Sequence, residues 1–279
     1  VLMLLVLILI SKYLKREGKM YYFSLIVMGL CVVILMLSKQ LKINNSFPTQ
    51  VRPSKAIRLV EWNAHGSMSD EAMVKIFQDF DADIAIFPEL HHLTLLQNDL
   101  FGKNGLDSEK YAIFNSFQYT GQIAPVTVVV KKALGPYQQI ENLPETSFGT
   151  VYLKAQEATL PDIVALHTAP PLPSLMKSWR SDLSLIEKEM IPQQSKAIFA
   201  GDLNATDHHI RFKNYDDALW KTKKGTWPSF VLEIFKTQID HVFVPKNHAH
   251  VDDVDVEHVG DSDHLGVFVN VIWYVNDHT

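Results

Sequence analysis

The sequence holds one cysteine among its 279 residues, and this cysteine, Cys31, lies in an apolar run. A single cysteine excludes an intrachain disulfide and a zinc site built from cysteines. A thiol nucleophile would have to be Cys31, and its apolar setting argues against that role. The length and the 47 % apolar composition exclude a disordered tail, a coiled coil and a disulfide-stapled miniprotein.

Positive charge is scarce in most of the chain. Residues 1–55 carry eight Lys or Arg and one Glu, whereas residues 56–279 carry 18 Lys or Arg, 30 Asp or Glu and all twelve histidines, a balance of −12. An acidic domain of this kind does not attract a long polyanion through its overall field. If the domain handles phosphate, we expect it to need cations at the site.

The N-terminal region is apolar and basic. Tyr21–Leu37 is a run of seventeen residues without a charge, at the lower limit for a spanning helix, for which about 20 residues are typical. Two tyrosines at one end of the run suit a membrane interface. A buried core helix and a cleaved signal peptide are the alternatives, but no small-residue cleavage site follows Leu37.

We therefore expect one or more N-terminal transmembrane segments. The expected organisation is a hydrophobic membrane anchor at 1–45 that contacts the lipid bilayer through residues 21–37, a linker at 46–55, and a catalytic domain at 56–279. Residues 11–20 carry four basic residues against one acid, and positive loops stay in the cytoplasm. The domain is then expected to be periplasmic or extracytoplasmic, and no protein partner can be inferred.

The domain alternates strand-like and helix-like segments. Ser69–Phe80 and Ser174–Met190 carry apolar residues at helical spacing, with Ser69 and Ser174 as candidate N-caps. Short apolar segments predict strands at Ile57–Trp62, Ile84–Phe87, Val126–Lys132, Thr150–Gln156, Ile163–His167, Ala197–Ala200, Gln238–Val244 and Gly266–Trp273. Successive strands with intermittent helices favour packed sheets covered by helices over an alternating βα barrel.

Polar side chains recur where these strands end, and strand-end loops are where enzymes place reacting groups. Within GDLN, an extended backbone would aim Asp202 and Asn204 to one side and Leu203 to the core. The full set is Asn63 in WNAHG, Glu89 in IFPEL, His167 in VALHTAPP, Asp202 and Asn204 in GDLN, Asp240 in QIDHVFV, and Asp263 and His264 in GDSDHLG.

Three of these residues suit a divalent cation. Glu89 and Asp263 offer hard oxygen ligands for Mg²⁺ or Mn²⁺, and Asn63 adds a carbonyl oxygen. A bound cation of this kind would neutralise phosphate oxygens during phosphoryl transfer.

The remaining residues suit the handling of water and protons. Asp202 and Asn204 can position a nucleophilic water by hydrogen bonds. His264, oriented by Asp240, can act as a base or as a cation on a phosphate oxygen. Together with a cation, these groups would supply an aligned attacker and neutralised oxygens.

The ordered motifs WN, PEL, LH, GDLN, IDHVFV and SDH, with Thr226-Trp227-Pro228 before the IDHVFV strand, resemble the endonuclease/exonuclease/phosphatase superfamily. The resemblance spans about residues 56–273, and the anchor is similar to that of small bacterial membrane-linked members. It implies a DNase I-like, four-layered α/β/β/α sandwich with the site at one edge of two packed sheets. It also implies that a divalent metal, usually Mg²⁺, lies at Glu89, and that His167 contacts the phosphate.

One departure from the family pattern concerns the strand VTVVVKKA. Many members have Ser-Arg or Ser-Lys after this strand, whereas this chain has Lys131 and Lys132 without that serine. The resemblance therefore gives no basis for phosphate contacts from this strand, and no substrate is carried over from a single relative.

We expect a membrane-anchored, divalent-metal-dependent phosphoesterase that hydrolyses phosphodiester bonds by metal-assisted attack of water. Nucleic acid, a phospholipid headgroup and a small phosphoester remain open as substrates. Two alternatives also remain open. One is a catalytically silent binding module on a membrane tether. The other is a zinc-dependent hydrolase that uses the paired histidines at 91–92, 208–209 or 248–250, although no HExxH motif is present.

Overall fold

The computed structural model describes residues 54–275, apart from 98, 117–124 and 223. The expected anchor at 1–45 and nearly all of the linker lie outside the described residues. Within the described part of the chain, no helix combines the length and the apolar character that crossing a membrane requires.

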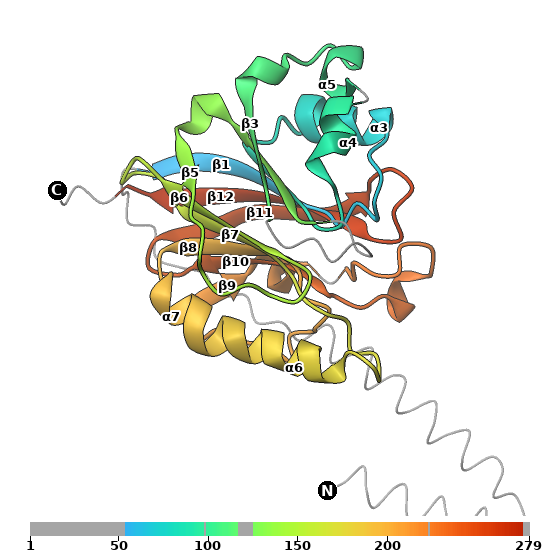
Figure 1. Cartoon of the computed structure of the whole chain (residues 1–279), viewed down its shortest axis with the longest axis vertical. Coiled ribbons are helices and arrows are strands. Elements are labelled where there is room, and N and C mark those ends of the chain that lie inside the picture. The colour runs from blue at the N-terminus through green and yellow to red at the C-terminus, as the bar shows by residue number, and fades with distance from the viewer. Residues whose placement is uncertain (1–53, 98, 117–124, 223, 276–279) are drawn as a thin grey trace, which may run out of the picture. The chain divides into compact units, whose positions relative to one another are not determined.

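Two six-stranded mixed sheets form the centre of this domain (Figure 1). The first sheet has the order β11 (Ala249–His258), β12 (Leu265–Tyr274), β1 (Ser54–Glu61), β2 (Ile84–Phe87), β4 (Thr127–Lys131), β3 (Tyr111–Asn115). The second has the order β5 (Tyr137–Gln139), β6 (Thr150–Ala155), β7 (Asp162–His167), β8 (Ala197–Asp202), β10 (Asp240–Pro245), β9 (Tyr215–Asp217). The pairs β1–β2 and β7–β8 are parallel, and the other neighbouring pairs are antiparallel.

The two sheets pack on each other through a shared aliphatic core. Successive side chains of a strand point to opposite faces, so alternate residues of β1 enter this core. Ile57 and Leu59 of β1 lie in the core with Ile198 and Ala200 of β8. Val60 belongs instead to the cluster on the outer face of the first sheet.

Helices cover both outer faces (Figure 1). The first sheet is covered by α3 (Asp70–Val74), which continues as η1 (Lys75–Asp79), and by α4 (His92–Gln97) and α5 (Leu100–Lys103). The second is covered by α6 (Met176–Leu185), which continues as η4 (Ile186–Met190), and by α7 (Ile191–Gln193). Four short 3₁₀ segments complete the described elements: η2 (Ser108–Lys110), η3 (Lys132–Leu134), η5 (Ala218–Lys221) and η6 (Glu233–Phe235). The expected two packed sheets with helices outside are therefore present.

The two predicted helix starts have different outcomes. Ser69 caps α3, because its hydroxyl accepts a hydrogen bond from the Ala72 N–H at 3.1 Å. The prediction for Ser174 is wrong: α6 begins at Met176, and its N-cap position is Leu175, which makes no side-chain cap. A turn closed by the Leu175 N–H on the Leu172 carbonyl at 2.9 Å places Ser174 before the helix.

Candidate active site

Six strands bring their polar ends to one edge of the two sheets. In the first sheet, parallel β1 and β2 end there, and antiparallel β12 begins there. In the second sheet, parallel β7 and β8 end side by side with His167 opposite Asp202, and antiparallel β10 begins with Asp240 opposite Asp202. This topology gathers the eight predicted site residues, because each of them lies at or just beyond one of these strand ends.

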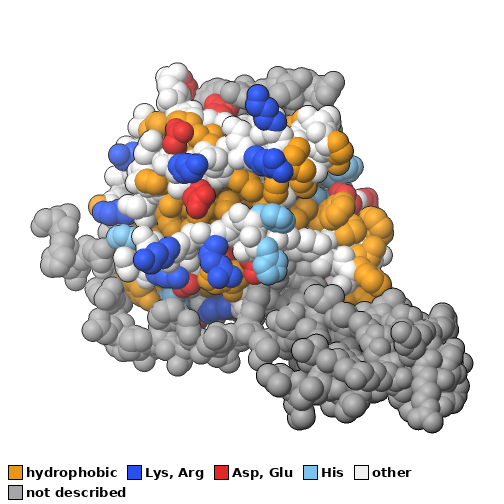
Figure 2. All heavy atoms as spheres, turned by 90° about the horizontal axis from the view of Figure 1, so that it is seen from below, with side chains coloured by type: hydrophobic (Ala, Val, Ile, Leu, Met, Phe, Trp, Pro, Cys, Tyr) orange, Lys and Arg blue, Asp and Glu red, His pale blue; other side chains and the backbone are white. Residues whose placement is uncertain are grey.

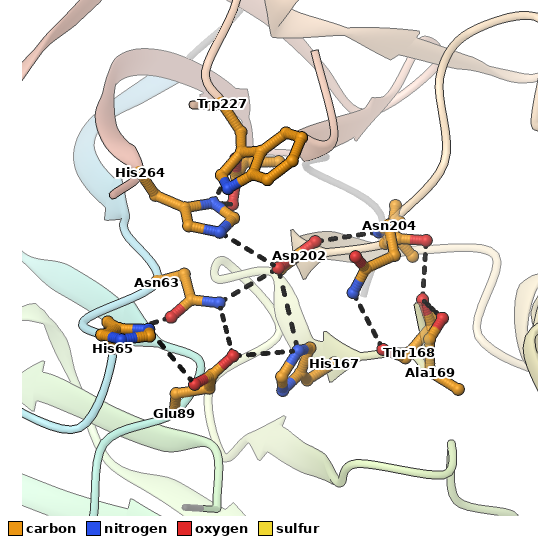
Figure 3. Close-up of polar contacts among 12 residues, drawn as sticks. Asn63, His65, Glu89, His167, Thr168, Ala169, Asp202, Asn204, Trp227 and His264 are labelled. Carbon is orange, nitrogen blue, oxygen red and sulfur yellow. Dashed lines mark hydrogen bonds and ion pairs between the residues drawn. The ribbon is translucent and has the colours of Figure 1, made fainter. Parts of the chain in front are cut away.

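Asn63 joins the two sheets at this edge (Figure 3). Its Nδ2 donates to Glu89 Oε1 at 3.1 Å and to Asp202 Oδ2 at 3.0 Å. Its Oδ1 accepts the His65 N–H at 2.9 Å. Glu89 follows β2 and Asp202 ends β8, so one buried amide fixes a carboxylate from each sheet. The carbonyl oxygen keeps a second lone pair for a further ligand.

Glu89 and Asp263 both lie near Nδ1 of the His65 ring. His65 Nδ1 is 3.9 Å from Glu89 Oε2 and 3.6 Å from Asp263 Oδ1. Trp227 holds the second oxygen of Asp263, since its Nε1 donates to Asp263 Oδ2 at 2.9 Å. Asp263 Oδ1 is buried and accepts no hydrogen bond from the described residues. An unsatisfied carboxylate oxygen near a second carboxylate fits the donor set that a hard divalent cation requires.

Asp240 and His264 form a buried pair beside Asp202. His264 Nδ1 is 2.9 Å from Asp240 Oδ2, and His264 Nε2 is 3.8 Å from Asp202 Oδ2. Burial by itself would lower the pKa of His264, but the charge and hydrogen bond of Asp240, with the charges of Asp202 and Asp263, raise the pKa to about 10. His264 is therefore an imidazolium at neutral pH.

Asp202 occupies the centre of the network. Burial, followed by the nearby charge of Asp240, raises the pKa of Asp202 to about 7, against the lowering effect of His264 and of hydrogen bonds from Asn204 and Asn63. Its Oδ1 accepts the Asn204 N–H at 2.8 Å. A carboxyl group in this setting can accept a proton from a neighbouring water.

The expectation of an extended backbone across GDLN is wrong. Asn204 has a left-handed backbone with φ of 45°, and its Nδ2 donates to the Thr168 carbonyl at 3.1 Å. The chain therefore turns after Asp202, where β8 ends, and the Asn204 N–H donates back to Asp202 Oδ1. Leu203 is fully buried in the cluster under α6, as expected.

Left-handed backbone recurs at this edge. His65 and Glu89 have φ of 47° and 57°, so three of the six non-glycine residues with positive φ in the described chain belong to the site. Non-glycine residues adopt this region at a cost of roughly 1–3 kcal/mol, and such residues cluster at functional sites. Hydrogen bonds hold the side chains of Glu89 and Asn204, whereas the exposed His65 ring lies at ion-pair distance from two carboxylates.

His167 ends β7 and is almost fully buried. Its Nε2 is 3.7 Å from both Glu89 Oε1 and Asp202 Oδ2, and its ring packs edge-on against Phe148. Burial and the charge of His264 lower the pKa of His167 to about 3. The ring is therefore neutral, and it can donate from one nitrogen without adding charge to the site.

Sequence reasoning missed His65 and Glu61. His65 lies two residues after Asn63 in the WNAHG motif, and its Nδ1 is near the carboxylates of Glu89 and Asp263. Glu61 is fully buried at the end of β1, and both of its carboxylate oxygens lack a hydrogen-bond partner in the described part of the chain. Burial, then the charges of Asp240 and Asp202, raise the pKa of Glu61 well above its usual value. For Glu61, the sequence offered one signal of a functional position, which is a charged residue at the end of an apolar strand.

Asp202, Asp240 and His264 also offer three metal-ligand atoms within 4.8 Å of one another. This trio is a possible metal site, although His264 Nδ1 already bonds Asp240. None of the paired histidines at 91–92, 208–209 or 248–250 belongs to such a group in the described residues. Lys131 does not reach the site: its Nζ pairs with Asp81 at 2.5 Å, at the far end of β4.

Known proteins resemble this chain in sequence profile and in fold. The sequence profile of the Endonuclease/Exonuclease/phosphatase family matches residues 60–264. No curated protein matches the chain by sequence.

Solved structures share the fold at low identity. D. rerio TDP2 complexed with a single-strand DNA product has 14 % identity and a TM-score of 0.58, over 78 % of this chain and 99 % of that one. An endonuclease/exonuclease/phosphatase family protein from Bacteroides thetaiotaomicron has 15 % identity and a TM-score of 0.56, over 80 % and 100 %. The endonuclease domain of TRAS1, a telomere-specific non-LTR retrotransposon, has 17 % identity and a TM-score of 0.53, over 78 % and 98 %.

Proposed function

The chain belongs to the endonuclease/exonuclease/phosphatase family, with its DNase I-like fold, and on that premise we propose that it is a divalent-metal-dependent phosphoesterase that hydrolyses phosphodiester bonds. One observation carries the proposal. The Asn63 amide joins Glu89 of one sheet to Asp202 of the other, with the buried Asp240–His264 pair beside them. Negative oxygens for a cation and a cationic imidazole thus line the same edge.

Glu89, Asn63 and Asp263 are the residues that would hold Mg²⁺ or Mn²⁺. All three offer oxygen, which these cations prefer, and among their oxygens Asp263 Oδ1 is buried without a hydrogen-bond partner in the described chain. When bound, the cation would supply Lewis-acid neutralisation of the phosphate oxygens.

Of the other residues, two bind the attacking water and two bind the phosphate. Asp202 and Asn204 hold the attacking water, and Asp202 Oδ2 receives its proton. His264 keeps its charge through Asp240 and faces a phosphate oxygen as negative charge develops there. His167 donates from a neutral ring to a second phosphate oxygen, which adds orientation without another charge.

Nucleic acid and smaller phosphodiesters are supported by different observations. D. rerio TDP2 was solved with a single-strand DNA product and TRAS1 contributes an endonuclease domain, so these relatives favour nucleic acid. The balance of −12 over residues 56–279 favours a substrate that is not a long polyanion, such as a lipid headgroup or a small diester.

The N-terminal sequence supports a proposal about location. We propose that residues 21–37 anchor the protein in a membrane and that the domain lies on the periplasmic or extracytoplasmic side, because basic residues concentrate in 11–20. Alkaline phosphatase fused after Asn45 should be active, since it forms its disulfides only after export. A fluorescent green fluorescent protein fusion at the same position, with inactive alkaline phosphatase, would place the domain in the cytoplasm.

The function itself is tested with the full chain and a soluble diester, bis(para-nitrophenyl) phosphate. Hydrolysis should require Mg²⁺ or Mn²⁺, stop with excess chelator and return when either cation is restored. Activity in excess chelator would contradict the metal dependence. Activity that only Zn²⁺ restores would favour the zinc hydrolase, and metal binding without hydrolysis of any diester would favour the silent binding module.

A further inference from the structure

The exposed apolar side chains of this domain gather beside the site. In the described chain, six large hydrophobic residues are exposed: Leu172, Trp227, Phe230, Leu232, Ile234 and Phe235. Leu172 lies in the loop that follows His167, and the other five lie within 227–235, before β10. The first loop begins directly after a site residue, and the second is joined to Asp263 by hydrogen bonds from Ser229 and Trp227. Figure 2 shows hydrophobic side chains standing out at an edge of the molecule, next to acidic and histidine side chains.

The segment Ser229–Phe235, hereafter the apolar loop, is the main part of this surface. Four of its side chains, those of Phe230, Leu232, Ile234 and Phe235, are 54–79 % exposed. Scattered single hydrophobic residues are normal on a protein surface, but four on one seven-residue segment form a contiguous patch. Such a patch indicates a binding surface.

The base of the apolar loop is hydrogen-bonded next to the proposed cation site. At its base, Trp227 and Thr237 exchange backbone hydrogen bonds of 3.0 and 2.6 Å. The Ser229 N–H donates to the Asp263 carbonyl at 2.7 Å, and Ser229 Oγ donates to the Ser262 carbonyl at 3.0 Å. These bonds place the start of the patch beside Asp263.

The charges of the apolar loop argue against a nucleic acid as its ligand. Glu233 is its single charged residue, and this side chain is turned back to accept the Gly225 N–H and to lie 3.7 Å from Lys236 Nζ. No Lys or Arg lies within 227–235 to pair with phosphates. Surfaces that bind single-stranded nucleic acid combine a positive groove with aromatic rings. In the apolar loop, by contrast, two of the four exposed side chains, Leu232 and Ile234, are aliphatic.

A zwitterionic lipid surface suits both the exposed side chains of the apolar loop and the negative charge of the domain. Aliphatic and aromatic side chains insert together into the boundary between headgroups and acyl chains, to a depth of about 5–10 Å. A domain with a balance of −12 is repelled by anionic membranes, so the match is to zwitterionic lipid. The same chain carries the uncharged run Tyr21–Leu37.

We propose that the apolar loop inserts into a zwitterionic lipid surface and presents lipid headgroup phosphodiesters to the site. The statement about substrate rests on the proposed function, whereas insertion itself does not. Insertion depends on Phe230, Leu232, Ile234 and Phe235, and it is not driven by charge, so added salt leaves it unchanged.

A site-specific label tests insertion in the full chain. In a Cys31→Ser background, Leu232→Cys carries an environment-sensitive fluorophore, and Ala158→Cys carries the same label as the matched control. Ala158 is exposed in the turn before β7, at the end of that strand opposite His167. In phosphatidylcholine vesicles, replacing the lipid with acyl-brominated phosphatidylcholine should quench the label at 232 and not at 158. Equal quenching, or none at 232, would overturn the proposal. A change in the fluorescence of the 232 label with single-stranded DNA, and none with vesicles, would also overturn the proposal and would assign the patch to nucleic acid.

Hydrolysis separates this proposal from the proposed function. The variant Phe230→Ser/Leu232→Ser/Ile234→Ser/Phe235→Ser should lose about tenfold or more of its activity on sphingomyelin and phosphatidylcholine vesicles. Its activity on bis(para-nitrophenyl) phosphate should stay within about twofold, since the apolar loop has no part in the chemistry. Equal loss on both substrates, or no loss on vesicles, would overturn the proposal. Quenching at 232 without hydrolysis of either substrate would support insertion and refute the phosphoesterase function alone.

Discussion

His264 Nδ1 lies 2.9 Å from Asp240 Oδ2, and both side chains are buried. This contact directs the other ring nitrogen, Nε2, toward Asp202. The charge and hydrogen bond of Asp240, with the charges of Asp202 and Asp263, outweigh the effect of burial and raise the pKa of His264, which keeps the imidazole charged. Of the two roles that the sequence left open for His264, base or cation, this geometry favours the cation.

The alkaline limit of activity should follow the pKa of His264. A cationic role requires the protonated ring, so activity should persist through pH 8 and fall as the pH passes about 10. Asp240→Asn removes the charge that raises this pKa while burial still lowers it, so the alkaline limb should move to lower pH by about one unit or more. The measurement is kcat/KM against pH for both proteins. An unmoved limb, or wild-type activity that rises through pH 10, would contradict the cationic role.

Replacing the cation should affect rate more than folding. His264→Gln keeps a hydrogen-bond donor for Asp240 and removes the charge, so kcat should fall on the order of 10²-fold, as for loss of one electrostatic element. The melting temperature should change little, because the buried carboxylate keeps a partner. His208→Ala is the matched control, since its exposed ring lies outside the site. A His264→Gln protein with wild-type kcat would refute the assignment.

Glu89 should control the dependence on cation. Glu89→Gln keeps the shape of the side chain but removes the negative charge, so the Mg²⁺ concentration for half-maximal activity should rise and the maximal rate should fall by roughly 10²-fold or more. Titration of activity with Mg²⁺ measures both quantities. Glu157→Gln, at an exposed turn away from the site, is the control. Equal responses of the two variants would exclude Glu89 as a ligand.

Glu61 should make the fold less stable as pH rises. Its pKa is raised in the folded protein by burial and by the charges of Asp240 and Asp202, while the unfolded chain ionises near 4.5. The folded state therefore binds the extra proton, and the free energy of unfolding falls as the pH increases above about 4.5 until the folded pKa is passed. Glu61→Gln cannot ionise, so it should melt at a higher temperature than wild type at pH 8 and near the same temperature at pH 4. Lower stability of Glu61→Gln at pH 8 would contradict this.

The strands that sequence reasoning found are those with a local apolar signal. β2 and β6 are buried runs, and their predicted positions agree with the structure to within a residue or two. β5 and β9 have three residues each and exist because a neighbouring strand supplies their hydrogen bonds. β11 is rich in acids that face solvent on an edge strand, and a bulge between Val251 and Asp253 interrupts its alternation. Such strands are specified by pairing rather than by composition.

The residue types of the site, and their place at strand ends, were determined by the sequence itself, because an apolar strand and the polar residue after it are neighbours in the chain. The contacts between them were decided only by the tertiary structure. Asn63 meets Asp202 across 139 positions, and this contact forms only when two sheets with separate strand orders pack together. The same packing buries Asp240 against His264, and this burial with an opposite charge, invisible in the order of residues, sets the protonation of the imidazole.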